Sequence, residues 1–305
     1  MSALNQPRFQ NAESAREFLE ALRWPQGPIC PHCGVVGGHY SLTGKSTRPG
    51  LWKCKDCREQ FSVTVGTVFE RSKIGLHIWL QAAYLMTSSK KGMSAHQLHR
   101  TLGVTYKTAW FMAHRIREAM TGTPTGQLGG GGKTVEADET YYGNIPGKPI
   151  RGGSKKHKNK IMALVERDGD VRAFHVAEVD GRNVREVIKA QIARKTHLMT
   201  DEAHVYKALG RDFRHSTVNH SIYEFARGEV STNTVEGYFS ILKRGLTGIY
   251  QHVSEKHLQR YVEEFSFRYN HRQSQGVNDE MCAIAALKGI EGKRLTYRRT
   301  NESAA

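Results

Sequence analysis

The spacing of apolar residues changes character part-way along the chain. Upstream of residue 126, apolar residues recur at helical intervals in a short amphipathic stretch over 12–22 and through most of 76–118. Downstream of residue 133, short alternating or wholly apolar runs take turns with helical ones. This change predicts a largely helical part followed by an α/β part.

The downstream runs predict strands and helices in a definite order. The expected strands are 133–143, two within 161–179 joined by a hairpin turn at Asp168-Gly169, and 197–203. The expected helices are 181–193, 233–245 and 255–272.

The helix expected over 233–245 has one charged edge. A helix turns about 100° per residue, so Glu236 and Lys243, seven residues apart, lie within roughly 20° of each other. The opposite side is apolar and carries Val235, Tyr238, Phe239, Leu242 and Leu246. Such a helix packs its apolar side on a core and shows its charged edge to a cleft.

Four of the five cysteines form two CxxC pairs separated by twenty residues, namely Cys30, Cys33, Cys54 and Cys57. This spacing is typical of a zinc ribbon with four thiolate ligands. The metal would supply the folding energy that so short a segment cannot obtain from a core. His32 and His39 are alternative ligands, and a redox dithiol is the competing interpretation. Cys282 lies in an apolar helical stretch and is expected to be a core thiol.

The segment 94–120 predicts two helices joined by a tight turn at Gly103, as in a helix-turn-helix. The second helix would enter a DNA groove with its first residues at base edges. Its outward positions are expected to be Thr105, Tyr106, Lys107 and Trp110, with His114, Arg115 and Arg117 farther along. A plain helical hairpin is the alternative.

These patterns divide the chain into five parts. We expect an N-terminal helix and zinc ribbon over 1–68, a helix-turn-helix region over 69–125, a flexible glycine-rich linker over 126–133, a catalytic domain over 134–275, and a C-terminal helix and tail over 276–305.

The charge balance indicates a polyanionic partner. The net charge is +16 and the pI is about 9.7, and basic proteins bind phosphate backbones through release of counterions. A run without acids over 143–160 suits a backbone clamp, although a solvated loop is the alternative. Its candidate DNA-binding residues are Arg151, Lys155, Lys156, Lys158 and Lys160. No apolar run of about 18 residues and no signal peptide is evident, so we expect an intracellular protein without a membrane partner.

Three acids occur where the chain can bring them together. Asp138 lies in the first downstream strand, Asp201 at the end of the fourth, and Glu236 on the later helix. This order of elements matches a ribonuclease-H-like arrangement, in which the three carboxylates converge on divalent metal. Hard cations such as Mg²⁺ prefer carboxylate oxygen, and two ions about 3.5–4 Å apart drive in-line displacement at phosphorus.

Neighbouring acids compete for these roles. Glu139 should point to the opposite sheet face because side chains alternate along a strand. Glu136 shares the face of Asp138 but lies two residues back, and Glu202 can cap a turn. Lys243 can hold a phosphate as a point charge.

The combination of motifs resembles the zinc-ribbon DDE transposases of bacterial insertion sequences. The resemblance rests on CPHCG and CKDC, on ADETYYG, TDEAHVY and the long run from NTVEGYFSILKRG to FRYNHR, and covers about residues 15–272. It implies an α/β, ribonuclease-H-like domain with a mixed five-stranded sheet, preceded by a zinc ribbon and a helix-turn-helix region.

The resemblance also implies an activity. Asp138, Asp201 and Glu236 would be the metal-binding triad, loaded with Mg²⁺ or Mn²⁺, with Lys243 as the accompanying lysine and structural Zn²⁺ in the ribbon. Arg244, the next residue, is a further candidate for DNA binding. The partners would be double-stranded DNA, both terminal inverted repeats and target, and further copies of the chain, because two ends need two active sites. A bacterial, cytoplasmic protein at the nucleoid is expected. The alternatives are a DNA-binding regulator without strand chemistry and a structure-selective nuclease.

Overall fold

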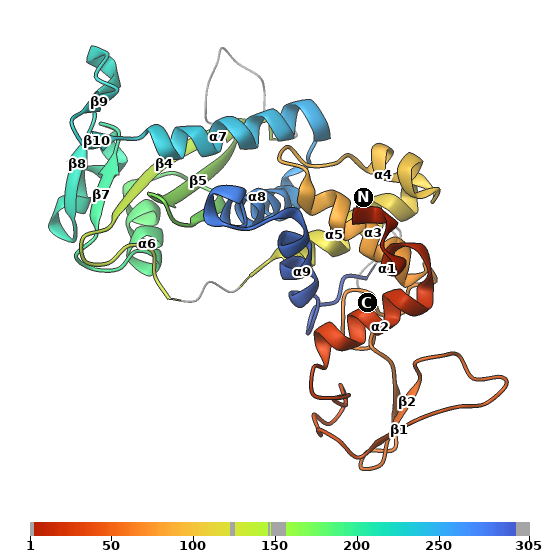
Figure 1. Ribbon diagram of the computed structural model, residues 1–305. Coiled ribbons are helices and arrows are strands. Elements are labelled where there is room, and N and C mark those ends of the chain that lie inside the picture. The colour runs from red at the N-terminus through yellow and green to blue at the C-terminus, as the bar shows by residue number, and fades with distance from the viewer. Residues whose placement is uncertain (1–2, 123–125, 146, 148–156, 297–305) are drawn as a thin grey trace. The chain divides into compact units, whose positions relative to one another are not determined.

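The computed structural model describes residues 3–122, 126–145, 147 and 157–296 (Figure 1). The described chain divides into two compact units. The first unit comprises residues 1–89, 93–120 and 279–305, and the second comprises residues 90–92 and 121–278. Among the described residues, no helix combines the length and apolarity needed to cross a bilayer.

The first unit joins a small three-stranded sheet to a set of helices. Its strands follow the antiparallel order β1-β2-β3 and are β1 (His39–Ser41), β2 (Trp52–Cys54) and β3 (Gln60–Phe61). Its main helices are α1 (Pro7–Gln10), α2 (Ala12–Arg23), α3 (Leu76–Ser88), α4 (Ala95–Leu102), α5 (Tyr106–Met120) and α9 (Asp279–Lys288). The last helix of the chain therefore completes the first unit, where it packs on α3 and α5.

Helix ends in the first unit follow local chemistry. The Asn11 side chain accepts a hydrogen bond from the Ser14 amide and caps α2, and Ser94 caps α4 through the Gln97 amide. Gly103 ends α4 with φ at 64°, in the left-handed region that glycine enters without strain. The two expected helices of 94–120 are therefore present, joined at the expected glycine.

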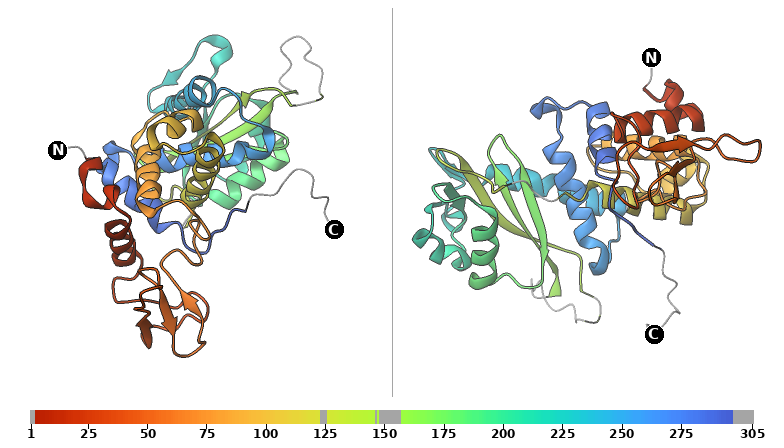
Figure 2. Two further views of the ribbon diagram at one scale, coloured as in Figure 1. Left: turned by 90° about the vertical axis from the view of Figure 1, so that its right-hand side faces the viewer. Right: turned by 90° about the horizontal axis from the view of Figure 1, so that it is seen from below.

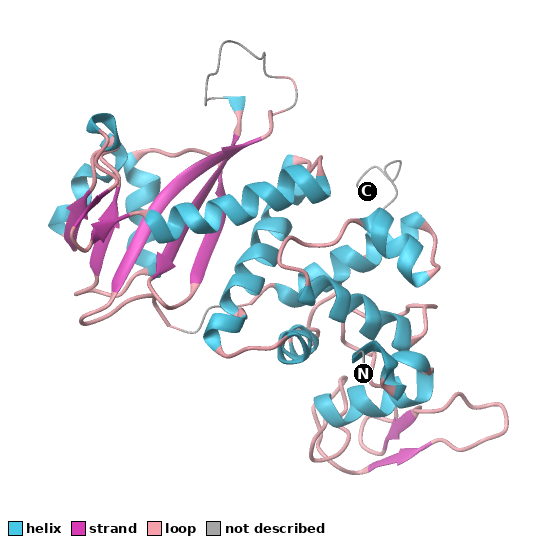
Figure 3. Ribbon diagram, turned by 45° about the horizontal axis from the view of Figure 1, so that its top comes forward, coloured by secondary structure: helices cyan, strands magenta, loops and turns pink. Residues whose placement is uncertain are grey.

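The second unit is built on a mixed sheet of five strands in the order β6-β5-β4-β7-β8 (Figure 3). The strands are β4 (Thr134–Tyr142), β5 (Asn159–Glu166), β6 (Val171–Val176), β7 (His197–Thr200) and β8 (Arg214–Thr217). The first three pair antiparallel, whereas β4–β7 and β7–β8 are parallel. The α/β, ribonuclease-H-like fold expected from the element order is thus confirmed.

Helices cover both faces of this sheet (Figure 2). One face packs against α6 (Gly181–Gln191) and η3 (His204–Arg211), and the other against α7 (Asn233–Gly245), the π-helical turn η5 (Leu246–Tyr250) and α8 (Glu255–Asn270). β5 is buried along its whole length because both of its faces are covered. A small hairpin, β9 (Ala226–Arg227) and β10 (Val230–Ser231), precedes α7.

The glycine-rich segment 126–133 is attached to the second unit, contrary to the expectation of a free linker. Leu128 is 4% exposed in the core on the α6 face and exchanges backbone hydrogen bonds with Gln191 and Ala193. The Gly129 amide donates to Glu166 at 2.7 Å. A single leucine among glycines carries too little periodicity to reveal this docking.

Candidate catalytic and metal sites

The four cysteines of the two CxxC pairs meet at one point in the first unit. Their sulfurs all lie within 4.8 Å of one another, with Cys30 and Cys57 3.6 Å apart and Cys33 and Cys54 3.7 Å apart. Four sulfurs about 2.3 Å from a tetrahedral ion would be separated by roughly 3.8 Å. The donor set therefore fits Zn²⁺ in both chemistry and spacing.

The neighbouring histidines have other roles. The His39 Nε2 atom lies 3.0 Å from the Val35 carbonyl oxygen, and its ring packs edge-on against Phe61. His32 is exposed and lies near the Gln60 carbonyl. Neither belongs to the group of four sulfurs, so the alternative ligand set receives no support from the structure.

The pairing of β4 with β7 positions the first two acids. The parallel register places Val135 beside Leu198 and Glu136 beside Met199. If this register is continued for two residues past its last pair, position 201 falls beside position 138, and the charge of Asp201 is among those that act on Asp138. Asp201 directly follows the end of β7, so the sheet itself brings these two carboxylates to neighbouring positions.

The helix that carries Glu236 is fastened to the same strand by a different acid. Glu136 is completely buried, and its Oε2 atom accepts hydrogen bonds from the Thr234 and Val235 amides at 2.7 and 3.0 Å. Its Oε1 atom accepts from the Thr234 hydroxyl at 2.9 Å. These amides belong to the first turn of α7, where a negative charge is favoured by the helix dipole. A strand residue thus caps the N-terminus of α7.

Arg167, in the turn between β5 and β6, completes this anchor. Its Nε atom donates to Glu136 at 2.7 Å, and its Nη2 atom donates to the Ser231 hydroxyl at 2.8 Å. A further bond reaches the Glu229 carbonyl at 2.8 Å. One guanidinium therefore joins β4 to the segment that leads into α7. Sequence reasoning missed both residues, since nothing in the local pattern says that an acid within a strand caps a distant helix.

Glu236 itself is exposed on the first turns of α7. Its Oε1 atom accepts from the Thr232 hydroxyl at 2.8 Å and lies 3.6 Å from the His220 Nε2 atom. Lys243 and Arg244 are exposed on the last turn of α7, and Arg244 donates to the Ser240 side chain. The apolar side of α7 is buried as expected, at Val235, Tyr238, Phe239 and Leu242.

The electrostatics of Asp138 show that the acids share one region. Burial, and then the negative charge of Glu139, Asp201 and Glu236, raises the pKa of Asp138 to about 7. Groups of three or more histidine, cysteine, aspartate or glutamate side chains can hold a metal ion when their ligand atoms lie close together. Within the described residues the four cysteines alone form such a group, so the three acids are farther apart than that. A cation bound among these carboxylates would favour their ionised forms.

The competing acids are engaged elsewhere. The Tyr206 hydroxyl donates to the Glu139 carboxylate at 2.5 Å, and Tyr206 belongs to the core on the α6 face. Glu139 therefore points to the side opposite Asp138, as the strand period predicts. Glu202 accepts hydrogen bonds from the His220 and Ser221 amides and caps that turn.

The candidate DNA-binding residues have mixed outcomes. Thr105, Tyr106 and Lys107 are exposed at the start of α5, but the farther positions expected to face outward, His114, Arg115 and Arg117, are buried. The Arg115 guanidinium donates to the Glu70 and Leu295 carbonyls because α5 is covered on that side by the rest of its unit.

The basic run over 143–160 is only partly described. Arg151, Lys155 and Lys156 lie outside the described residues, and Lys158 is half-buried. Lys160 is 6% exposed and donates to the Ala177 carbonyl and to Glu178 at 2.8 and 2.9 Å. These bonds tie Lys160 to the segment that follows β6, and its contact with DNA stays a prediction.

Known proteins share both parts of this architecture. The model of the ISXO2-like transposase domain matches residues 127–270, and that of the transposase zinc-ribbon domain matches residues 10–60. An uncharacterized protein in the transposable element ISH50 of Halobacterium salinarum is 28% identical over 282 residues, which cover 85% of this chain and 91% of that protein.

A solved structure, the Mos1 strand transfer complex, aligns with 65% of this chain and 77% of its own at 12% identity and a TM-score of 0.20, a likeness too remote to bear on mechanism. The two family matches, together with the four-sulfur cluster and the five-stranded sheet, carry the assignment. The chain belongs to the zinc-ribbon DDE transposases of insertion sequences.

Proposed function

We propose that the protein binds the terminal inverted repeats of an insertion sequence, cleaves the 3′ ends and joins them to target DNA. The observation that carries this proposal is the construction around β4. Asp138 lies on β4, the parallel register with β7 brings Asp201 beside it, and Glu136 holds the first turn of the helix that bears Glu236.

The three carboxylates would hold two divalent ions, Mg²⁺ or Mn²⁺. Such ions supply Lewis-acid activation and charge neutralisation for displacement at a phosphodiester. The raised pKa of Asp138 fits this role, because a group that is hard to ionise alone is readily ionised beside a cation.

The remaining roles fall to residues that position DNA. Lys243 and Arg244, exposed on the last turn of α7, would contact phosphates near the scissile bond. Thr105, Tyr106 and Lys107 would reach base edges from the start of α5, while the ribbon and the basic run add affinity that does not depend on sequence. Coordinated cutting of two ends calls for at least two copies of the chain on DNA.

The test is cleavage and joining of a labelled DNA end from the element that flanks the gene, with Mg²⁺ present. Asp138→Asn and Glu236→Gln should each lower both activities by roughly 10³-fold or more, since loss of several kcal/mol of metal-derived stabilisation costs a factor of ten per 1.4 kcal/mol. DNA binding should remain.

Glu139→Gln is the matched control, because Glu139 adjoins Asp138 but bonds Tyr206 on the other face of the sheet. Its cleavage should stay within a few-fold of wild type. Equal losses in Asp138→Asn and Glu139→Gln would contradict the assignment. Binding without cleavage by the wild type would favour a regulator, and cleavage without joining would favour a nuclease.

A further inference from the structure

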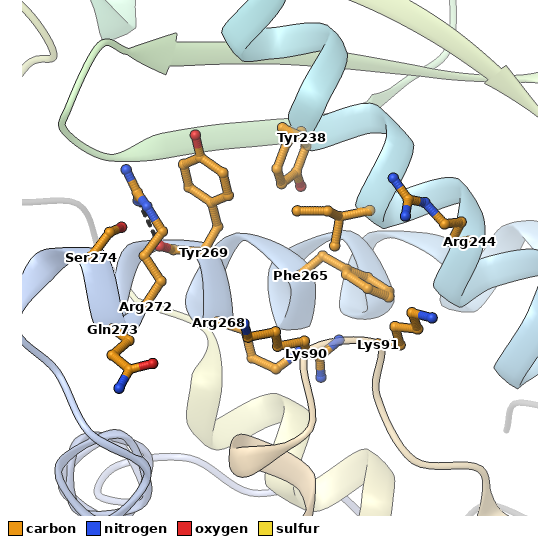
Figure 4. Close-up of a pocket in the computed structure, with 11 residues that line it drawn as sticks. Lys90, Lys91, Tyr238, Arg244, Phe265, Arg268, Tyr269, Arg272, Gln273 and Ser274 are labelled. Carbon is orange, nitrogen blue, oxygen red and sulfur yellow. Dashed lines mark hydrogen bonds between the residues drawn. The ribbon is translucent and has the colours of Figure 1, made fainter.

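A cavity within the second unit lies between α7, α8 and the short segment 90–92 (Figure 4). Its volume is roughly 590 Å³, within the range of about 300–1,000 Å³ typical of small-molecule sites. Figure 4 shows Tyr238 and Arg244 reaching it from α7, and Phe265 and Tyr269 from α8.

This cavity is separate from the carboxylate site although both use α7. Ile241, which lines the cavity, follows Glu236 by five residues, and this places it about 140° around the helix. Lys243 shares the side of Glu236, within roughly 20°. The helix therefore turns Ile241 away from the side that carries Glu236 and Lys243.

The walls of the cavity are aromatic and aliphatic. Tyr238 and Phe265 are buried beneath its surface, Tyr269 is half-buried, and Ile241 is 38% exposed. The Tyr238 and Tyr269 rings meet edge to face with centroids 5.5 Å apart, which fixes the orientation of Tyr269. An exposed isoleucine and aromatic rings that line one cavity offer a surface on which a flat apolar group can lie.

The rim of the cavity is cationic. Lys90, Lys91 and Arg244 are exposed there, and Arg272 stacks on the Tyr269 ring with 4.0 Å between guanidinium carbon and centroid. No aspartate or glutamate lines the cavity, and none of the four cations forms an ion pair with a described acid. The rim therefore favours an anion.

Arg268 adds an unsatisfied group at the floor. It is 7% exposed, and one nitrogen is paired with Glu264, whereas its Nε and Nη2 atoms have no hydrogen-bond partner among the described residues. Buried N–H groups without acceptors are uncommon in folded proteins.

We propose that this cavity binds a nucleotide, with its base against Ile241 and the neighbouring aromatic wall and its phosphate beside Lys90 and Lys91. A planar ring joined to a phosphate is the chemistry that an aromatic wall with a cationic rim recognises. The nucleotide is either free or an unpaired nucleotide of a DNA strand. The second source rests on the proposed function, whereas binding itself needs no strand chemistry.

The test uses the full chain loaded with zinc and carrying Asp138→Asn, so that DNA is not cut. Binding is measured by fluorescence with three probes: 2-aminopurine deoxynucleoside monophosphate, a single-stranded oligonucleotide containing one 2-aminopurine, and the same base inside a blunt duplex. Ile241→Glu places a negative charge in the cavity, and Lys90→Ala/Lys91→Ala removes half of the rim cations. The matched control is Ile222→Glu, at an isoleucine 68% exposed elsewhere in the same unit.

Each cavity variant should weaken binding by about tenfold or more, since stacking of one base contributes about 1–3 kcal/mol, while the control should match the parent. If the cavity variants bind both the monophosphate and the oligonucleotide more weakly than the parent, the cavity is a general nucleotide site. If only the oligonucleotide binds more weakly, the cavity is a site for an unpaired nucleotide within a strand.

Unchanged binding of both probes by folded cavity variants would overturn the proposal. So would competition by inorganic phosphate at the same concentration as the nucleotide, because the base would then contribute nothing. Failure of cleavage in the earlier assay would leave this result untouched, which keeps the two proposals distinguishable.

Discussion

The two candidate metal sites are built in opposite ways. The four cysteines come from two short turns close together in the sequence, and their sulfurs already lie within 4.8 Å of one another. The carboxylates come from strand β4, from the residue after β7 and from helix α7, and they are less compact than the sulfurs. In the first site the metal ligands would also stabilise the fold of the ribbon. In the second site the strands and the helix that carry the acids are positioned by other contacts, namely the pairing of the strands and the bonds of Glu136 and Arg167.

The largest effect should follow removal of zinc. Because the ribbon's three short strands offer little core, Cys54→Ser or a chelator should unfold residues 25–65, and structural zinc contributes about 10–16 kcal/mol in isolated ribbon-sized peptides. The sheet of the second unit should persist, because it contains none of these ligands. Hydrogen exchange resolved by segment would measure both.

Simultaneous loss of protection in β4 and β5 would show that the fold of the second unit depends on zinc, contrary to this prediction. Cys282→Ser is a suitable control, since Cys282 is buried in α9 away from the four sulfurs. It should leave zinc content at one ion per chain.

Replacement of Glu136 should have the second largest effect on stability. Glu136→Ala leaves two α7 amides and the partly exposed Arg167 without their acceptor, and breaking a buried pair costs about 3–5 kcal/mol. Denaturant unfolding should show a loss near the lower end of that range. Glu136→Gln should recover part of it, because its amide oxygen can still accept from α7.

Rates of DNA strand cleavage can show whether Glu136 positions the catalytic residues or only stabilises the fold. At a temperature where both variants are folded, Glu136→Ala should lower the rate far more than a core substitution of equal cost, such as Ile188→Ala on the α6 face. Equal rates in the two variants would reduce Glu136 to a stabilising residue.

Two glycines of α7 offer a smaller and internally matched comparison. A Cβ atom at Gly245 would lie 2.1 Å from the Phe265 ring and 2.8 Å from the Lys91 carbonyl oxygen, whereas Gly237 has nothing within 4 Å. Gly245→Ala should destabilise by about 1–3 kcal/mol through overpacking. Gly237→Ala should stabilise by about 0.5–1 kcal/mol through helix propensity. Thermal unfolding measures both, and a stabilised Gly245→Ala would show that the far end of α7 is loosely held.

The smallest expected effect is the loss of stability at low pH that comes from Asp212. Asp212 accepts from Arg185 and Lys189 at 2.7 and 3.0 Å, and these bonds lower its pKa to about 2. A lowered folded pKa gives stability that is present above the ordinary value of 3.8 and is lost as pH falls toward 2. The difference in melting temperature between wild type and Asp212→Asn should therefore shrink between pH 5 and pH 3. A difference independent of pH would point to packing rather than charge.

The comparison also explains what the sequence could predict. CxxC spacing and strand periodicity are local, so the ribbon ligands and the order of the sheet elements were readable, and the opposite orientation of Glu139 followed from strand geometry. The roles of Glu136 and Arg167 depend on pairing across roughly 30 and 100 residues, which no local pattern encodes. The buried His114, Arg115 and Arg117 were misplaced because charged residues on a helix were assumed to face solvent.

The bond between Glu136 and Arg167 has a consequence for descent. Glu136 left in place after the loss of Arg167 would be a fully buried charge without a cation, whereas Arg167 alone would keep its bonds to Ser231 and to the Glu229 carbonyl. An element that no longer moves can accumulate destabilising substitutions. An element that still moves needs a folded protein, so a variant with Glu136 but no cation beside it should be lost. Among relatives that still move, a glutamate at position 136 should therefore be accompanied by a cation at position 167, and a copy with the glutamate and no such cation should be inactive.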